Sequence, residues 1–128
     1  MAAPDELTPD AHAFLAERHV GTLSTIRRDG TLHVCAVGFT WDPDARVVRV
    51  ITRDGSQKVR NVERTGRAAV AQVDGGRWLS LEGPARVARE PDAVAVAVTR
   101  YTERYHEPRP SPERVAIEIA VERILGRA

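Results

Sequence analysis

Short runs of β-favouring residues, separated by turn signals, dominate the chain from Val20 onward. Apolar and polar residues tend to alternate in these runs, with the period of a half-buried strand. Asp29-Gly30, Asp42-Pro43-Asp44 and Gly75-Gly76 lie between neighbouring runs and supply the backbone angles that tight hairpins need. The six runs are residues 20–26, 32–40, 46–52, 67–74, 77–87 and 115–125. This pattern predicts a mainly β, antiparallel barrel, because a doubly wound sheet would alternate strand with helix.

Three helices are expected at the margins of the barrel. Thr8-Pro9 is a helix start, and the helix that follows should end near His19. A second helix is predicted over about residues 57–64, with Ser56 as its cap. A third should run from 91 to about 105. With six strands and few helices, residues 1–128 are expected to form one domain whose core spans about 7–126.

The last predicted strand has two different faces. One face carries Val115, Ile117, Ile119 and Val121, and the other carries Ala116, Glu118, Ala120 and Glu122. The first face should be buried, whereas the second should meet water or a partner. We expect that partner to be a second copy of the chain.

Length and charge exclude several classes of function. The chain has 128 residues, and its 19 basic and 18 acidic side chains leave a net charge of +1. A nucleic-acid or anionic-membrane binder would carry a stronger positive field. No apolar run approaches the ~20 residues of a membrane-spanning helix, and residues 1–6 lack a signal-peptide pattern, so we expect a cytoplasmic protein. The lone Cys35 excludes an intrachain disulfide, and the four scattered histidines predict no metal site.

Residues 52–61 form the segment with the clearest chemical signal. A strand end, a glycine and the start of a helix meet here, so unpaired backbone amides and the positive end of the helix dipole favour an anion. Arg53 and Lys58, the only lysine among the basic residues, would add charge-assisted bonds. Residues 52–67 hold five cations and two anions, a net charge of +3. The alternative is an ordinary solvated helix with an Arg-rich face.

The run 33–39 is poor in bulky residues for a packed strand. Gly38 within it marks either the close approach of a ligand or a bend of the barrel. Cys35 is expected to be a small buried apolar residue, because no basic pattern around it indicates an activated thiolate.

The run 77–83 places Trp78, Ser80 and Glu82 on the face opposite Leu79 and Leu81. Since the leucine face should enter the core, the tryptophan face is left for a partner, for a planar ligand, or to cap the core edge. Tyr101 and Tyr105, one helical turn apart, are interpreted as a packing stripe.

No set of nucleophile, base and orienting group is visible in the sequence, so the catalytic residues are unknown. If the chain is an enzyme, a bound cofactor must supply the reactivity.

Three segments, residues 33–39, 50–61 and 72–83, resemble the deazaflavin-dependent reductases of the pyridoxamine-phosphate-oxidase-like, flavin-binding split-barrel superfamily. Within that superfamily the chain is most similar to the biliverdin reductases that use coenzyme F-420. The resemblance implies a homodimer of six-stranded split barrels with two cofactor sites at the subunit interface.

The resemblance also implies roles for particular residues. Arg53, Ser56, Lys58 and Asn61 would hold the cofactor phosphate and its tail, residues 34–38 with Ile51 and Thr52 would flank the ring, and Trp78 and Ser80 would complete the pocket from the other subunit. The full set of expected cofactor-binding residues is Val34, Cys35, Ala36, Val37, Gly38, Ile51, Thr52, Arg53, Ser56, Gln57, Lys58, Asn61, Trp78 and Ser80.

The chemistry implied is hydride transfer from reduced F-420 to a conjugated acceptor, with biliverdin, a tetrapyrrole, as the expected substrate and bilirubin as the product. Two alternatives stay open. One is an oxidoreductase of the pyridoxamine-phosphate-oxidase type that uses flavin mononucleotide (FMN), and the other is a non-catalytic protein that binds F-420, a flavin or haem.

Overall fold

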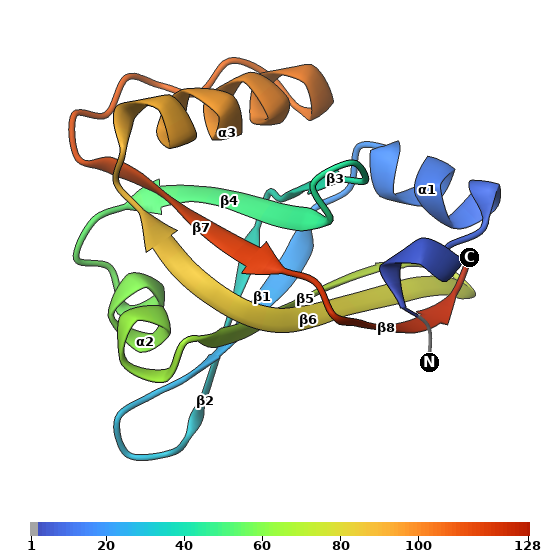
Figure 1. Ribbon diagram of the computed structural model, residues 1–128, viewed down its shortest axis with the longest axis horizontal. Coiled ribbons are helices and arrows are strands. Elements are labelled where there is room, and N and C mark those ends of the chain that lie inside the picture. The colour runs from blue at the N-terminus through green and yellow to red at the C-terminus, as the bar shows by residue number, and fades with distance from the viewer. Residues whose placement is uncertain (1–2) are drawn as a thin grey trace.

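The computed structural model describes residues 3–128, which form a mainly β protein with three α-helices (Figure 1). The strands are β1 (Gly21–Ile26), β2 (Leu32–Val37), β3 (Thr40–Asp42), β4 (Val47–Arg53), β5 (Arg67–Asp74), β6 (Arg77–Ala88), β7 (Arg114–Ala120) and β8 (Arg123–Arg127). The helices are α1 (Pro9–Ala16), α2 (Gln57–Thr65) and α3 (Pro91–Arg104), preceded by a short 3-10 turn, η1 (Pro4–Glu6). None of the described helices has the length and apolar character needed to cross a bilayer.

The strand count differs from the prediction, because two of the six predicted strands are each broken into two. The run 32–40 becomes β2 and β3, separated at Gly38 and Phe39, and the run 115–125 becomes β7 and β8, separated at Val121 and Glu122. In both places the chain passes from one sheet to another, so it cannot remain in a single ladder. The described residues therefore contain eight strands rather than six.

The strands follow one hydrogen-bonded path in the order β2-β1-β5-β6-β7-β4-β3, with β8 paired to β6 outside this path. All described pairings are antiparallel. The long β6 belongs to two sheets: its first half pairs with β5 and β8, and its second half pairs with β7. We call β2-β1-β5-β6-β8 sheet A and β6-β7-β4-β3 sheet B. The two ends of the path, β2 and β3, are joined by the chain itself at Gly38 and Phe39.

The core lies between the two sheets and α1 and α2. Its largest fully buried side chains include Phe14, Phe39, Leu23, Leu81 and Ile117. As predicted, Leu79 and Leu81 point inward and Trp78 outward on β6. The apolar face of residues 115–121 is also buried.

The second face of β7 is only partly open, in contrast to the sequence expectation. Helix α3 packs on β4 and β7, as Figure 1 shows, and it covers Ala116 in a small cluster with Ala88 and Ala97. Small residues allow the helix to approach the sheet closely at this point. This part of the β7 face is therefore covered by the chain's own helix.

The helix boundaries follow from local capping. Thr8 caps α1 by accepting a hydrogen bond from the Ala11 N–H at 3.1 Å, but α1 ends at Ala16, before the predicted His19, because Glu17 is extended. Helix α2 ends at Thr65, and the C-cap residue Gly66 has a φ of 68°, the left-handed conformation that is common after a helix.

Candidate functional site

A cleft of about 360 Å³ opens where the ends of β2 and β4, the first turn of α2, helix α3 and the segment before β7 meet. Its lining residues are Ala36, Val37, Gly38, Ile51, Thr52, Arg53, Lys58, Tyr101, Ser111 and Arg114. The first seven of these are among the predicted cofactor-binding residues. The structure thus brings two separate predicted segments, 36–38 and 51–58, to one place.

The entry of the chain into α2 leaves backbone donors unpaired at the cleft. Ser56 stands at the N-cap position, as predicted, but its side chain makes no capping bond and its Oγ lies 3.5 Å from Thr52 Oγ1. No acidic residue occupies the first turn of α2. Because the first N–H groups of a helix have no partner within it, this end of α2 favours an anion.

Three basic side chains line the cleft, and none of its lining residues is acidic. Arg53 on β4 and Arg114 on β7 stand directly opposite each other in the register of the two strands, an arrangement in which like charges repel. Arg114 donates to the Arg109 carbonyl. Within residues 3–128, neither Arg53 nor Lys58 has a hydrogen-bond or ion-pair partner for its side chain. A bound anion would relieve the repulsion.

The acidic residues of this segment are bound to another cation. Arg89 donates two hydrogen bonds to the Asp54 carboxylate, at 3.0 and 2.9 Å, and a third to Glu63 at 3.1 Å. The hydrogen bonds from Arg89 hold the pKa of Asp54 below its ordinary value. The carboxylates of Asp54 and Glu63 therefore bind Arg89 rather than Arg53 or Lys58.

Gly38 lies against two tyrosine rings, those of Tyr101 on α3 and of Tyr105, the C-cap residue of that helix. A Cβ atom at this position would lie 2.9 Å from Tyr101 Cε2 and 3.1 Å from Tyr105 Cε2. The two rings pack against each other with centroids 4.9 Å apart, as the predicted packing stripe requires. Glycine is thus needed here for close packing of α3, and the same packing places Tyr101 at the cleft.

The end of α3 is held in place by Arg104 and Tyr105. Arg104 donates to Gln72 Oε1 at 2.5 Å, to the Glu17 carbonyl at 2.9 Å and to the Phe39 carbonyl. The Tyr105 hydroxyl lies 2.6 Å from the His19 carbonyl and accepts from the Phe39 N–H at 3.2 Å. Burial lowers the pKa of Arg104 and raises that of Tyr105. These contacts fix the wall of the cleft that α3 provides.

Tyr101, Ser111 and Arg114 were not predicted as site residues. Arg114 reaches the cleft because β7 pairs with β4, a long-range pairing that local spacing cannot reveal. The helical spacing of Tyr101 and Tyr105 was visible in the sequence, but it does not show which element the rings cover.

The other predicted site residues lie outside the cleft. Val34 is 56% exposed on the outer face of sheet A, and Cys35 packs against the core. Asn61 is fully buried, and its side-chain amide donates to Thr25 Oγ1 at 3.0 Å. Gln57 donates to Asn61 Oδ1 at 2.8 Å and lines a different hollow. In this structure Asn61 joins α2 to β1.

Trp78 and Ser80 also lie outside the cleft of their own chain. Both are on the outer face of sheet A, where Trp78 is 40% exposed.

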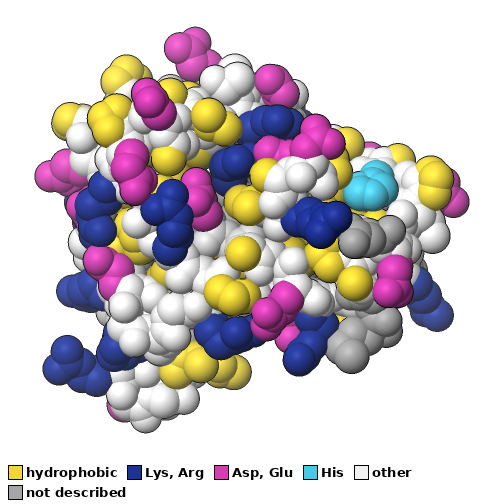
Figure 2. Space-filling model, viewed as in Figure 1, with side chains coloured by type: hydrophobic (Ala, Val, Ile, Leu, Met, Phe, Trp, Pro, Cys, Tyr) yellow, Lys and Arg dark blue, Asp and Glu magenta, His cyan; other side chains and the backbone are white. Residues whose placement is uncertain are grey.

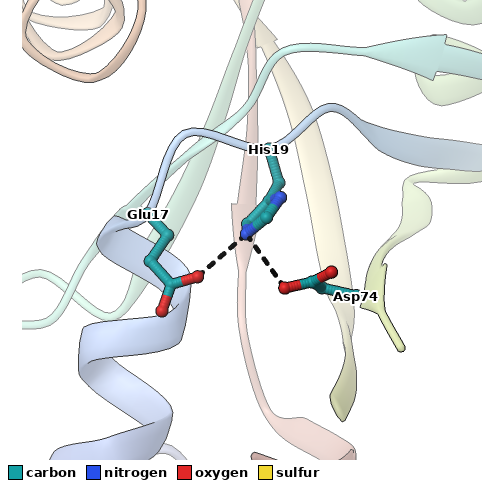
Figure 3. A group of neighbouring side chains, drawn as sticks. All are labelled: Glu17, His19 and Asp74. Atoms are coloured by element: carbon teal, nitrogen blue, oxygen red, sulfur yellow. Dashed lines mark hydrogen bonds and ion pairs between the residues drawn. The ribbon is translucent and has the colours of Figure 1, made fainter. Parts of the chain in front are cut away.

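Glu17, His19 and Asp74 form a cluster of possible metal ligands that the sequence pattern did not predict (Figure 3). His19 Nε2 lies 2.9 Å from Glu17 Oε1 and 3.8 Å from Asp74 Oδ2. Arg77 already occupies both carboxylates, at 2.8 and 3.0 Å from Glu17 and 2.5 Å from Asp74. A metal ion would have to compete with this guanidinium, so the cluster is best described as an ion-pair network.

Comparison with known proteins gives consistent matches over nearly the whole chain. Residues 7–128 match the family described as pyridoxamine 5'-phosphate oxidase. A Mycobacterium tuberculosis protein named F-420H(2)-dependent biliverdin reductase is 56% identical over 122 residues, which are 95% of this chain and 89% of the relative.

Solved structures agree with this match. A conserved hypothetical protein from Mycobacterium tuberculosis superimposes with a TM-score of 0.81 and 26% identity, covering 94% of this chain and 84% of the other. A protein described as an F-420 reductase gives a TM-score of 0.76 and 26% identity, covering 93% of this chain and 98% of the other.

Proposed function

The chain belongs to the pyridoxamine 5'-phosphate oxidase family, and from this premise we propose that it reduces biliverdin to bilirubin with reduced coenzyme F-420. It is an F-420-dependent oxidoreductase, since it is 56% identical to an F-420H(2)-dependent biliverdin reductase over 95% of its length. The choice of biliverdin as acceptor is supported by the name of this one relative. In the structure, the proposal rests on one observation. The basic side chains of Arg53 and Lys58 line the same cleft as the small residues Ala36 and Gly38.

The residues of the cleft fit a deazaflavin that carries a phosphate. Arg53, Lys58 and the first turn of α2 offer donors to the phosphate, and no side chain of the described residues competes for the two cations. The backbone and small side chains of residues 36–38, together with Ile51, line the cleft where a planar ring would lie. Gly38 adds no side chain here and lets the Tyr101 ring pack close to the backbone.

The protein's part in the reaction is to bind and to orient. When bound, F-420 supplies the hydride. Arg53 and Lys58 would hold the anionic end, and the ring of Tyr101, which the anchored end of α3 holds in place, forms part of the lining next to Gly38. Positioning of this kind accounts for a large share of the rate enhancement in enzymes whose cofactor carries the chemistry.

The outer face of sheet A supports the homodimer that the family resemblance implies. Its exposed apolar side chains are Ile26, Leu32, Val34, Val73, Trp78 and Leu125. Exposed apolar surface of this extent on one sheet face is typical of an interface with another protein. We propose a second copy of the chain as that partner.

The strand register connects this face to the cleft. Ala36, Thr22, Ala71, Ser80 and Leu125 stand in one row across β2, β1, β5, β6 and β8. Ala36 also lines the cleft. A second copy on this face would therefore reach the rim of the cleft, which supports the proposal that the partner's Trp78 and Ser80 complete the site.

Titration of the purified protein with F-420 and, in parallel, with FMN tests the cofactor. We expect micromolar or tighter binding of F-420 and weaker binding of FMN, followed by bilirubin formation when biliverdin is added to the protein with reduced F-420. Preference for FMN would move the chain to the flavin-dependent branch, and tight binding of F-420 without turnover of any acceptor would indicate a non-catalytic binding protein.

Lys58→Ala tests the cleft itself. Loss of one charge-assisted hydrogen bond, worth ~1.5–3 kcal/mol, should weaken F-420 binding by roughly 10- to 100-fold. The matched control is Arg18→Ala, which removes one exposed positive charge between α1 and β1. Equal affinities of the two variants would mean that Lys58 belongs to a solvated helix face only.

A further inference from the structure

One polar side chain lies inside the core and does not line the cleft. Gln72 on β5 is fully buried, and its strand partner on β6 is the core residue Leu79. Burying an amide costs free energy unless its donor and its acceptor are both hydrogen-bonded. Gln72 Nε2 donates to the Phe14 carbonyl at 2.9 Å, and Gln72 Oε1 accepts from Arg104 at 2.5 Å. Gln72 thus joins β5 to α1 and to the end of α3.

The guanidinium that Gln72 binds has no acidic partner in the part of the chain that the structure describes. The N–H groups of Arg104 point instead to three neutral oxygens: the side-chain oxygen of Gln72 and two backbone carbonyls, those of Glu17 and Phe39. Its guanidinium carbon also lies 4.8 Å from the centroid of the Phe39 ring and 5.1 Å from that of Tyr105. Because no counter-ion holds this half-buried charge, it depends on each of its acceptors. Loss of the Gln72 oxygen should therefore displace Arg104.

Helix α3 needs this anchor because it buries little of itself. Of its fourteen residues, all of them described, only Ala97 is buried. Ala97 packs in the small cluster with Ala88 and Ala116, whereas Val96 is 43% exposed. Figure 2 shows hydrophobic side chains on the surface along the top of the molecule, where α3 lies in Figure 1. The position of α3 over sheet B therefore depends strongly on the hydrogen bonds at its end.

Two parts of the cleft lining are tied to this anchor. Arg104 and the Tyr105 hydroxyl both bind the backbone of Phe39. Phe39 directly follows residues 37–38, which line the cleft. Tyr101, which also lines the cleft, precedes Tyr105 by one turn, and the centroids of the two rings are 4.9 Å apart. A displacement of Arg104 would therefore reach both parts of the lining.

We propose that Gln72 is a positioning residue for the cleft, which acts through Arg104 on the end of α3 and on the backbone next to Gly38. This inference rests on the proposed function, in which the cleft holds the deazaflavin ring. Gln72 does not line the cleft, so it touches neither cofactor nor acceptor there. Its replacement should weaken binding because the shape of the lining changes, not because a contact with the cofactor is lost.

The test compares two substitutions of Gln72 that differ in what they leave for Arg104. Gln72→Met is similar in size but offers no oxygen, so Arg104 loses an acceptor. Gln72→Glu keeps an oxygen for Arg104 and loses the donor to the Phe14 carbonyl, which still accepts from the Glu17 N–H at 3.2 Å. Gln72→Met should weaken F-420 binding by roughly 3- to 30-fold, the range of remote coupling within a network, whereas Gln72→Glu should stay within about twofold of the wild type.

Two controls separate positioning from a loss of stability. Ile124→Val changes a buried core residue on β8, outside this network, and should lower the urea midpoint without weakening F-420 binding. In an Arg104→Met background, Gln72→Met should cause no further loss of F-420 affinity, because the residue through which Gln72 acts is absent. If Arg104→Met does not fold, the comparison of Gln72→Met with Gln72→Glu decides.

Hydrogen exchange of the protein without ligand tests the network independently of the proposed function. The Phe39 N–H donates to the Tyr105 hydroxyl, and the Tyr105 N–H donates to a carbonyl of α3. After correction for the change in global stability, both amides should exchange about tenfold faster in Gln72→Met than in the wild type, and at the wild-type rate in Ile124→Val.

The outcomes separate a failure of this inference from a failure of the proposed function. A wild type that binds no F-420 would count against the proposed function, and faster exchange in Gln72→Met would then still support the control of the lining by Gln72. Unchanged exchange in Gln72→Met would overturn the proposal. So would F-420 binding by the wild type that Gln72→Met leaves unchanged, or that Gln72→Met and Gln72→Glu weaken equally.

Discussion

Replacement of Gly38 by alanine tests whether this glycine is present for packing against α3. The new Cβ would lie 2.9 Å from Tyr101 Cε2 and 3.1 Å from Tyr105 Cε2. Carbon atoms in optimal contact are about 3.5–4.0 Å apart, so both rings would have to move by about half an ångström. Overpacking of this kind costs about 1–3 kcal/mol, whereas loss of glycine's freedom in the unfolded chain returns about 0.4–1 kcal/mol. We expect a net destabilisation of about 0.5–2 kcal/mol.

The assay is urea unfolding at equilibrium, with the free energy of unfolding extrapolated to water and the m-value checked for constancy. Gly76→Ala is the matched control, because no atom lies within 4 Å of the position a Cβ would take there. Gly76→Ala should leave the stability unchanged or raise it slightly. A Gly38→Ala protein as stable as the Gly76→Ala protein would refute the reasoning.

A double-mutant cycle with Tyr101→Ala locates the clash. Once the Tyr101 ring is absent, Gly38→Ala should cost at least ~0.5 kcal/mol less than in the wild type. The same cost in both backgrounds would show that the strain does not come from Tyr101.

Three further outcomes are expected. Hydrogen bonds from Arg77, and then from His19, lower the pKa of Glu17 from 4.5 to about 2. Because the pKa is lower in the folded state than in the unfolded state, ionised Glu17 stabilises the fold. This contribution is fully present above pH 4.5 and is lost as the pH falls towards 2. Arg77→Gln should make the urea midpoint depend less on pH between pH 2 and 4.5, by a modest amount because the pair is exposed. An unchanged slope would contradict the assignment of this pH dependence to the Glu17–Arg77 pair. Asn61→Ala should lower the free energy of unfolding by about 1–3 kcal/mol, because Thr25, 2% exposed, loses its donor; a change below ~0.5 kcal/mol in urea unfolding would speak against a structural role. Trp78→Arg should shift the protein from dimer to monomer in sedimentation-velocity experiments, and an unaltered sedimentation coefficient would argue against the outer face of sheet A as the interface.

The features that the sequence predicted correctly are those with a local cause. The turns at Gly30 and Gly75 adopt positive φ angles of 88° and 62°, as residues between paired strands require. The helix 57–65 begins and ends within one residue of the prediction, and Ser56, the predicted cap, stands at its N-cap position. The cations of this segment were visible for the same reason, because they are neighbours along the chain.

The features that were missed have distant causes. The predicted strand 32–40 breaks at Gly38 because rings of α3, more than sixty residues later in the chain, pack on it. The predicted strand 115–125 breaks because β7 must leave sheet B for its continuation to pair with β6 in sheet A. Arg114 enters the cleft only through the pairing of β7 with β4. Such contacts have no signature in the spacing of one segment.

The position of β7 within sheet B also sets the order in which the protein can acquire its structure during synthesis. β4 is made early, yet its partner on the inner side of the sheet, β7, begins only at Arg114, near the end of the chain. Until then one side of β4 is an open edge, a site at which nascent chains associate wrongly. The arginines at 49 and 53 make this edge less prone to aggregate. Since the same pairing brings Arg114 to the cleft, the set of basic residues that line the cleft is complete only after β7 has been synthesised and has paired with β4.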